Sequence, residues 1–283
     1  MREPRLSRLT VVGLGLLGGS VARGARARGV ATEIVAVGRT PATLARARAA
    51  GVVDRTAHDL AEGVRDADLV VLCAPVGALP GLVRAAWPHL APGAVLTDVG
   101  SVKGAVVAAA QSCPSRADVA FVGGHPMAGS ERSGFDAADP DLFDGHVTLL
   151  TPTRGSPEGA VARLTAFWEA LGSHVRLLSP EVHDRSVAAV SHLPHLAVYA
   201  LVAAVDDDAL GLAGAGFHDT TRIAASAEAL WTDIFRENRQ PLLDALTQYR
   251  ELLAGWETLI RNGEWEAIEA ALARARKSRE KLG

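Results

Sequence analysis

The chain has 283 residues, of which 48% are hydrophobic and 22% are charged, a balance typical of a globular protein with one large or two smaller domains. A net charge of −3 excludes a general electrostatic attraction to nucleic acid or to an anionic membrane. The two cysteines, Cys73 and Cys113, suggest neither a disulfide framework nor a metal cluster, and they favour a reducing, cytoplasmic setting.

The N-terminal stretch predicts no signal peptide, because the apolar run at 9–17 already contains two glycines that belong to a different motif. No uninterrupted apolar run reaches the ~18 residues of a membrane helix. We therefore expect neither a membrane nor a nucleic acid as a partner.

Strands and helices are predicted to alternate over the first 180 residues. Short apolar, β-branched runs predict strands at 9–12, 34–37, 68–73, 94–98, 119–122, 146–150 and 174–178. Helical spacing predicts one helix that ends at Arg28 and further helices at 41–50, 77–87 and 157–171. Strands that alternate with helices at this spacing predict a parallel, doubly wound sheet.

The pattern changes near residue 180, where β-branched runs give way to sequence rich in Ala, Leu, Glu and Arg with helical spacing. We therefore predict an α/β domain at 1–179 and an all-helical domain at 180–283. The helical part carries large apolar faces, formed by Leu193, Leu196, Leu201, Leu242, Leu243, Leu246, Leu252 and Leu253. These faces pack either within the domain or against a second copy, and we favour a homodimer.

The first predicted strand ends in a glycine-rich turn, Gly13-Leu14-Gly15-Leu16-Leu17-Gly18. In chain order, such glycines permit a tight turn, the approach of backbone to a pyrophosphate, and close packing of helix on strand. The pyrophosphate would rest on the N-terminus of the following helix. Because the motif follows a strand and opens a helix, it predicts a Rossmann-type dinucleotide site rather than a turn without a ligand.

The second predicted strand ends in Gly38-Arg39-Thr40, where NAD enzymes usually place an acid that bonds the ribose 2′-hydroxyl. No carboxylate is present there to repel a 2′-phosphate, Arg39 can pair with one bidentately, and Thr40 adds a hydroxyl. We therefore predict NADP as the cofactor, with NAD as the alternative if Arg39 is only a solvated turn residue. Further cofactor contacts are expected from Ala74, Pro75 and Ser101, which follow later strands.

Three other stretches hold polar residues that a core would not favour. Ser101 lies in one of them, directly after the fourth predicted strand. His125 lies in the second, the stretch GGHPMAGSERSG at 123–134, which we interpret as a loop that leaves its histidine uncovered. The third includes His192 and His195 in the helical half. Those two histidines lack a neighbouring carboxylate or thiol, so we predict no metal site.

Together, the stretches VVGLGLLGGS, DVGSVKGAV, GGHPMAGSERSG, VSHLPHL and FHDTTRIAASAEALWTDIFREN resemble the prephenate/arogenate dehydrogenase family of tyrosine biosynthesis. The resemblance covers most of the chain. It implies a Rossmann-type domain followed by a helical dimerisation domain. It also implies an oxidative decarboxylation with hydride transfer to NAD(P)+, in which prephenate becomes 4-hydroxyphenylpyruvate or L-arogenate becomes L-tyrosine.

The resemblance assigns the catalytic base to His125, which would take the proton of the substrate's ring hydroxyl. Ser101 matches the family serine that hydrogen-bonds the same hydroxyl. The alternatives are a loop histidine that caps backbone and a serine that caps a helix.

The resemblance also implies a set of substrate-binding residues. Arg222 would hold the ring carboxylate, Asp219 would orient Arg222, and His192 would lie near the substrate's side chain. Trp231 matches a tryptophan close to the substrate, and Ser130 would contact cofactor or close the site. A surface ion pair between Asp219 and Arg222, or a core position for Trp231, are the alternatives.

Two other functions compete with this interpretation. A β-hydroxyacid dehydrogenase uses a catalytic lysine in its helical half, but here the only lysines of that half are Lys277 and Lys281, in the tail. An NADP-sensing regulator would not be expected to keep His125, Ser101 and Arg222 together. The residues leave prephenate and arogenate open, and we take prephenate dehydrogenase as the main prediction with arogenate dehydrogenase as the alternative.

Overall fold

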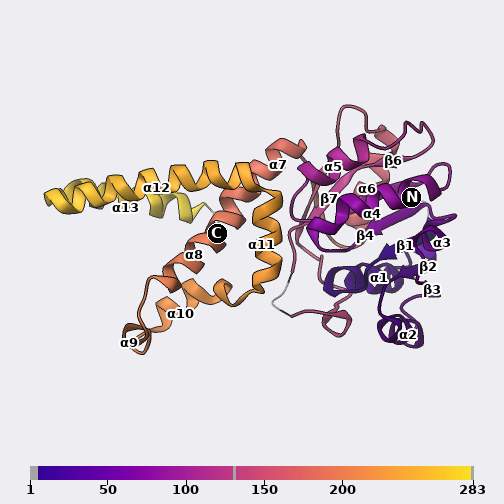
Figure 1. The fold of residues 1–283 in the computed structure, drawn as a ribbon, viewed down its shortest axis with the longest axis horizontal. Coiled ribbons are helices and arrows are strands. Elements are labelled where there is room, and N and C mark those ends of the chain that lie inside the picture. The colour runs from indigo at the N-terminus through magenta and orange to yellow at the C-terminus, as the bar shows by residue number, and fades with distance from the viewer. Residues whose placement is uncertain (1–5, 130–131, 282–283) are drawn as a thin grey trace.

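The computed structural model describes residues 6–129 and 132–281. Its N-terminal part is built on a parallel sheet in the order β3-β2-β1-β4-β5-β6, at the right of Figure 1. The order reverses between β1 and β4, the switch point of a doubly wound sheet, so the predicted fold class is confirmed. The strands are β1 (Leu6–Val12), β2 (Ala31–Val37), β3 (Arg55–Ala57), β4 (Leu69–Leu72), β5 (Val95–Asp98) and β6 (Ala120–Phe121).

Helices connect these strands and cover both faces of the sheet. They are α1 (Leu16–Arg28), α2 (Pro41–Ala49), α3 (Leu60–Val64), α4 (Leu79–Ala86) and α5 (Gly104–Gln111). Gly29 ends α1 with a left-handed φ of 64°, and Pro41 opens α2. The sequence did not predict β3 or α3, because three and five residues are too few to show a periodicity.

A smaller sheet follows, formed by β7 (Gly123–Pro126), β8 (Val147–Thr151) and β9 (His174–Leu177), with α6 (Glu158–Ala170) between β8 and β9. β7 is antiparallel to β8, and β9 is parallel to β8.

Residues 123–134 were predicted to form a loop that leaves His125 exposed. This was wrong for the first four of these residues, which form β7 and are buried. A Cβ on Gly123 would lie 2.5 Å from the hydroxyl of Thr151, and one on Gly124 would lie 2.7 Å from the backbone oxygen of Asp98. The two glycines therefore allow close packing of β7 on its neighbours.

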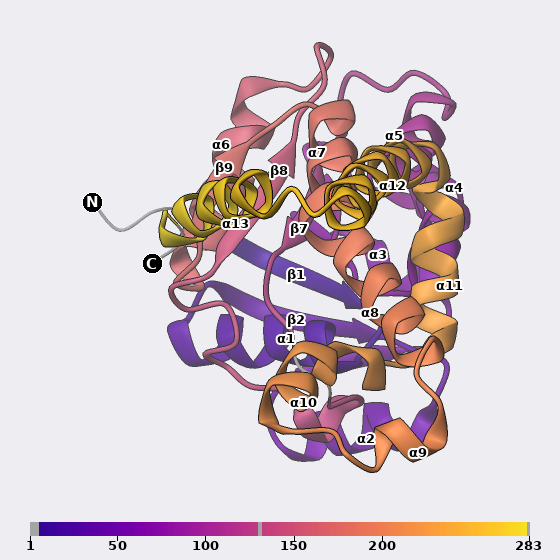
Figure 2. The same cartoon turned by 90° about the vertical axis from the view of Figure 1, so that its left-hand side faces the viewer.

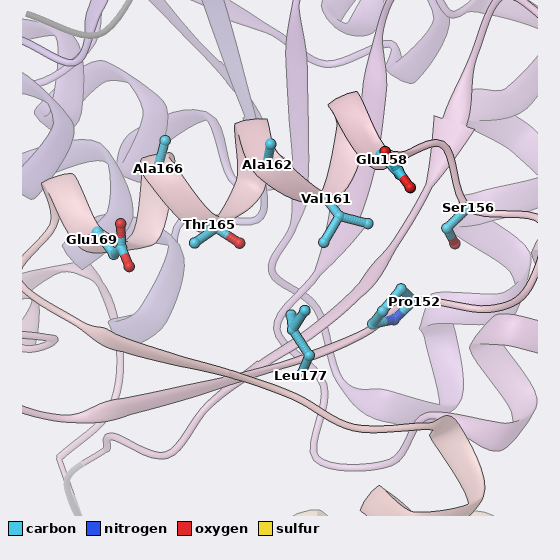
Figure 3. A pocket seen from close by; sticks show the side chains of 9 residues that line it. All are labelled: Pro152, Ser156, Glu158, Val161, Ala162, Thr165, Ala166, Glu169 and Leu177. Carbon is cyan, nitrogen blue, oxygen red and sulfur yellow. The ribbon is translucent and has the colours of Figure 1, made fainter. Parts of the chain in front are cut away.

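A hollow of about 510 Å3 lies on the outer side of α6. Figure 3 shows the side chains of α6 along one wall and Leu177 of β9 opposite them. The lining residues are Pro152, Ser156, Glu158, Val161, Ala162, Thr165, Ala166, Glu169 and Leu177. None of them lines the dinucleotide pocket described below, so this hollow is distinct from that pocket.

From Pro180 onward the described chain is helical, and α12 and α13 extend away from the sheets in Figure 1. Figure 2 shows the molecule turned by 90°, with the helical part in front of the sheets, and Figure 1 shows that α11 lies nearer to the parallel sheet than α8 does. The helices are α7 (Pro180–Val187), α8 (Leu193–Ala203), α9 (Asp207–Leu210), α10 (Ala215–Thr221), α11 (Glu228–Glu237), α12 (Arg239–Asn262) and α13 (Trp265–Glu280).

A π-helical turn, Ala188–His192, joins α7 to α8 without a break in the helix. Pro194 lies two residues after it and has no N–H to donate to the preceding turn, which is a common cause of such a widening. π-turns are frequent at functional sites, and this one carries His192.

Candidate active site

The glycine-rich turn between β1 and α1 borders a pocket of about 200 Å3. Gly13 has a φ of +95°, and a Cβ on Gly13 or Gly18 would overlap backbone oxygen atoms. A Cβ on Gly15 would meet no protein atom within 4 Å, so the space before the N-terminus of α1 is open. The pocket is lined by Gly13, Leu14, Gly15, Gly38, Arg39, Thr40, Thr43 and Leu44. This shape suits a dinucleotide: a phosphate would face the free N–H groups of α1 and a ribose would face Arg39.

The remaining predicted cofactor residues lie around the same edge of the sheet. Leu16 and Leu17 form the first turn of α1. Ala74 and Pro75 follow β4, and Ser101 follows β5. Ligands of doubly wound sheets bind outside the carboxyl ends of the strands, and these five residues all lie at that edge.

His125 is on β7, opposite Leu149 of β8, and only 9% of its surface is exposed. The prediction that glycines leave this histidine uncovered was therefore wrong. Its Nδ1 lies 2.9 Å from Nε2 of His183 on α7, and the Nδ1 of His183 lies 2.7 Å from Oδ1 of Asp184. A chain of carboxylate, imidazole and imidazole thus joins the helical half of the protein to β7.

The carboxylate of Asp184 sits at the N-terminus of α5. It accepts hydrogen bonds from the backbone N–H groups of Lys103 and Gly104, both at 2.8 Å. Burial opposes ionisation of Asp184, but the hydrogen bonds from His183 and from these two N–H groups hold its pKa below the usual value. Asp184 is therefore an anion at neutral pH.

A buried ion pair between Lys103 and Asp98 packs against β7 and hydrogen-bonds its backbone. Both side chains are fully buried, and Nζ of Lys103 bonds the carboxylate of Asp98. The same ammonium donates to the backbone oxygen of Gly124 at 2.7 Å, and Asp98 accepts from the N–H of Gly124 at 3.3 Å. The pair therefore fixes both backbone groups of the residue before His125.

Asn238 orients a second buried histidine. Its side-chain nitrogen donates to the backbone oxygen of Asp184 at 2.9 Å and faces Nδ1 of His192 at 3.0 Å. Because an amide nitrogen can only donate, Nδ1 of His192 accepts and Nε2 carries the proton of the neutral ring. That Nε2 is buried and has no hydrogen-bond partner among the residues that the structure describes, so it is a free donor for a ligand.

Trp231 on α11 belongs to an apolar cluster with residues of the parallel sheet and α4. The ring of His195 stacks on it, with centroids 3.5 Å apart. α11 itself packs on the 3-10 turn Val76–Ala78 that follows β4.

The other predicted substrate residues are less enclosed. Ser101 is half-buried in the β5–α5 connection, and no hydrogen bond joins it to His125 among the residues that the structure describes. Asp219 on α10 and Arg222 on the turn that follows α10 are both exposed, and no ion pair joins these two described residues. Arg222 is close enough to His195 to help lower its pKa, although burial of His195 is the larger cause. Ser130 lies outside the described residues.

Four residues that shape the site escaped the sequence analysis: Lys103, His183, Asp184 and Asn238. A lysine among the apolar residues Val99, Val102 and Val106 was a usable signal, because an isolated buried charge needs a partner. His183 and Asp184 lie on α7 and Asn238 lies in the turn between α11 and α12, where a single polar residue has no distinctive pattern.

The histidines of the site predict a pH-dependent stability. Burial lowers the pKa of His125 well below its usual value, with His183, Lys103 and His192 adding to the effect, and burial lowers the pKa of His192 to about 4. The unfolded chain binds these protons near pH ~6.5. Stability is therefore fully present above that value and is lost as pH falls toward about 4.

We expect the urea midpoint to be lower at pH 5 than at pH 7.5. A His192→Gln variant should show a shallower decline, because it removes one of the groups that must be protonated. Equal midpoints for the unmodified protein at the two pH values would contradict this prediction.

Comparison with known proteins identifies a nucleotide-binding domain in the part of the chain that contains most of the dinucleotide pocket. Residues 21–177 match the nucleotide-binding domain of prephenate dehydrogenase, and residues 179–274 match its dimerization domain. A cyclohexadienyl dehydrogenase of Zymomonas mobilis is 34% identical, covering 96% of this chain and 94% of that protein. A prephenate dehydrogenase of Bacillus subtilis is also 34% identical, covering 85% of this chain and 67% of that protein.

Solved structures of two related enzymes are similar to this protein over nearly the whole chain. The prephenate dehydrogenase of A. aeolicus, in complex with hydroxyphenyl propionate and NAD+, superposes with a TM-score of 0.91 at 30% identity and covers 100% of both chains. The arogenate dehydrogenase of Synechocystis superposes with a TM-score of 0.86 at 34% identity, over 98% of this chain and 100% of that chain. The chain therefore belongs to the prephenate dehydrogenase family and is an oxidoreductase that depends on a nicotinamide dinucleotide.

Proposed function

We propose that this protein is a prephenate dehydrogenase, which converts prephenate to 4-hydroxyphenylpyruvate and CO2 with transfer of a hydride to the dinucleotide. The observation that carries the proposal is the chain of His125, His183 and Asp184 at the same edge of the sheet as the dinucleotide pocket. A buried, neutral histidine at that edge is a suitable base for a substrate hydroxyl.

The residues around His125 fit the requirements of this reaction. A bound nicotinamide supplies the hydride acceptor. His125 takes the proton of the ring hydroxyl on Nε2, the nitrogen that His183 does not contact. Ser101 donates a hydrogen bond to the same hydroxyl oxygen, and Arg222 holds the ring carboxylate.

The free Nε2–H of His192 is suited to an oxygen of the substrate's side chain. Trp231 would contribute by holding His195 against the substrate pocket rather than by direct contact, since it is 8% exposed. Asp219 would act through Arg222 once a substrate anion is bound. Ser130 is proposed to contact the substrate or the cofactor, or to close the site.

The direct test is the increase in absorbance at 340 nm when the purified protein is mixed with prephenate and NADP or NAD. Turnover of prephenate with either dinucleotide supports the proposal. Absence of turnover with prephenate and with arogenate would overturn it and favour a dinucleotide-sensing role.

Arogenate is a second candidate substrate, because the arogenate dehydrogenase of Synechocystis is 34% identical and covers 98% of this chain. The two substrates differ only in a keto group or an ammonium group on the side chain. Ratios of kcat/KM for prephenate and arogenate, measured in parallel, decide between them.

NADP is the cofactor that we propose for this chain. The ribose end of the pocket contains Arg39 and Thr40, and none of the residues that line it carries a carboxylate. A carboxylate at this position would select NAD by bonding the 2′-hydroxyl and repelling a 2′-phosphate. The A. aeolicus structure contains NAD+, so NAD stays the alternative.

An Arg39→Ala variant is expected to raise KM for NADP by the ~10-fold or more that follows from losing a charge-assisted hydrogen bond to phosphate. KM for NAD should change little, because NAD has no 2′-phosphate. Arg48→Ala, which removes an arginine near the end of α2, is the matched control. A protein that prefers NAD before and after the Arg39 substitution would contradict the assignment.

We also infer that residues 180–283 form a domain distinct from 1–179 and that it joins two copies of the chain. No residue of α8 is buried within the chain, although α8 is apolar all round. α12 and α13 leave large side chains exposed, among them Leu252, Leu253, Trp256, Ile260 and Trp265. Surfaces of this kind mark an interface.

The stretch Pro180–Ala203 is, by length and a mean hydropathy of 1.5, able to cross a membrane, and only 17% of its apolar window is buried. Counting uninterrupted apolar residues did not reveal this. The stretch also carries His183 and Asp184, which are hydrogen-bonded to β7 and α5. We therefore assign its exposed surface to a second copy rather than to a lipid, and we propose a cytoplasmic homodimer without a nucleic-acid partner.

Light scattering of the detergent-free protein is expected to give twice the 29.5 kDa of one chain. Two aspartates, introduced as Leu252→Asp and Ile260→Asp, should shift the mass toward the monomer, because each places a charge in the interface. A monomer at micromolar concentration would contradict the inference.

A further inference from the structure

The geometry points to His183 and Asp184 as positioning residues that hold His125 in the tautomer with its proton on Nδ1, so that Nε2 faces the substrate as the base. This inference rests on the proposed function and deepens it. It also means that the base on β7 is completed by a helix from the other half of the chain.

The hydrogen-bond directions follow from one fixed point, the carboxylate of Asp184. A carboxylate can only accept, so Nδ1 of His183 must carry a proton and donate it. In the neutral ring of His183, Nε2 is then an acceptor. The contact of 2.9 Å between that Nε2 and Nδ1 of His125 therefore requires a proton on Nδ1 of His125. The lone pair of His125 is consequently on Nε2.

Backbone N–H groups, whose positions are fixed by the fold, hold the carboxylate of Asp184 in place. Its two oxygens accept from the backbone N–H groups of Lys103 and Gly104, at the start of α5. These donors fix the carboxylate as an anion and fix its orientation toward His183. The opposite arrangement, with the proton of His125 on Nε2, would leave two ring nitrogens without protons facing each other.

Charged and titratable groups from several elements surround this chain of contacts. Lys103 and Asp98 lie beneath β7 as a closed ion pair, and His192 lies on the π-turn beside α7. Burial and nearby positive groups both disfavour a cation on His125, whereas Nδ1 of His183 lies 2.7 Å from the carboxylate of Asp184. A proton gained by the pair of histidines is therefore better placed on His183.

This arrangement gives the proton a balanced path. The ring hydroxyl of the substrate gives its proton to Nε2 of His125, and Nδ1 of His125 gives its own proton to Nε2 of His183. His183 becomes the imidazolium, paired with the anion of Asp184, and His125 is neutral again with its proton on Nε2. Return of the proton along the same atoms, and release to solvent after the product leaves, restores the starting tautomer.

The tautomers can be observed without any substrate. In 15N-histidine-labelled protein, the nitrogen shifts of a neutral ring distinguish a proton on Nδ1 from one on Nε2. We expect the Nδ1–H tautomer for both His125 and His183 at pH 7.5. Signals are assigned with His183→Gln and His125→Asn variants, and His146→Gln, which changes an exposed histidine before β8, is the control. A proton on Nε2 of His125 would overturn the inference.

Kinetics of three variants separate positioning from mere packing. His183→Leu removes the acceptor and is expected to lower kcat by the ~10²–10⁴-fold range of a lost general base, with KM little changed. His183→Gln keeps an oxygen that can accept from Nδ1 of His125, so it should recover part of that loss. If Leu and Gln lower kcat equally, or if KM carries the whole effect, the positioning role is wrong.

Asp184→Asn tests whether the carboxylate of Asp184 sets the direction of the two hydrogen bonds that link it to His183 and His125. An amide can present N–H to His183, which reverses both tautomers and leaves His125 protonated on Nε2. A similar loss of ~10⁴-fold accompanies the corresponding change in a serine protease triad. The acid limb of kcat/KM should also move to lower pH, because the anion that favours the protonated pair is gone. An unmoved acid limb and unchanged tautomers would overturn the inference.

Failure of the proposed function can be told apart from failure of this inference. If the unmodified protein turns over neither prephenate nor arogenate, the function is wrong, yet the nitrogen shifts still report the tautomer of His125. If it turns over a substrate but shows the Nε2–H tautomer, only the inference is wrong.

Discussion

His125→Asn is expected to lower kcat by ~10²–10⁴-fold, the contribution of a positioned general base. The asparagine side chain matches that of histidine as far as the δ atoms but has no basic nitrogen. It can therefore hydrogen-bond a hydroxyl without accepting its proton. KM for the substrate should change little, because binding of the ring carboxylate is proposed to depend on Arg222.

Steady-state kinetics at saturating dinucleotide measure this effect. His146→Asn is the matched control, since His146 is an exposed histidine whose ring contacts only the backbone oxygen of Asp144 among the described residues. Far-UV circular dichroism of both variants verifies that the folds are intact. A His125→Asn variant with the kcat of the unmodified protein would show that another group is the base.

Lys103→Met should cause the largest loss of stability among the variants considered, on the order of 3–5 kcal/mol. Methionine fills a similar volume, but the carboxylate of Asp98 is then left buried without its cation. Gly124 also loses the donor to its backbone oxygen. Because Gly124 precedes His125, activity should fall together with stability.

Urea unfolding at one fixed protein concentration measures the change, since the stability of a dimer depends on concentration. The double variant Asp98→Asn/Lys103→Met should recover part of the loss, because it leaves no unpaired charge. Arg116→Met breaks the partly exposed ion pair of Arg116 with Asp118 and removes a hydrogen bond to the backbone oxygen of Trp87, so its effect should be much smaller. A Lys103→Met variant as stable as Arg116→Met would mean that the buried pair does not hold β7.

Most of the N-terminal fold could be predicted, because its signals are local in the chain. β4 is a continuous apolar run, and residues 9–12 of β1 are buried on both faces, which is the pattern of a parallel sheet. Gly29 and Pro41 mark a helix end and a helix start through their own backbone preferences. The glycine turn after β1 depends on three residues within six positions, so its sequence and its geometry coincide.

The site was predicted only in part, because its contacts join distant residues. His125 and His183 are 58 positions apart, and Lys103 and Asp184 are 81 positions apart. No periodicity or spacing relates such pairs. The glycines beside His125 also allowed two interpretations, exposure of the ring or close packing of the strand, and the neighbouring residues did not distinguish them.

The family resemblance singled out His125 as the proposed base, and the amino-acid sequence by itself determined the alternating strands and helices and the dinucleotide turn. These depend on backbone preferences and side-chain periods that act within a few residues. Only the tertiary structure decided that β7 is buried, that Lys103 and Asp98 clamp it, and that His183 and Asp184 set the tautomer of the base. Those features arise from hydrogen bonds in a low-dielectric interior, which exist only after remote segments have packed together.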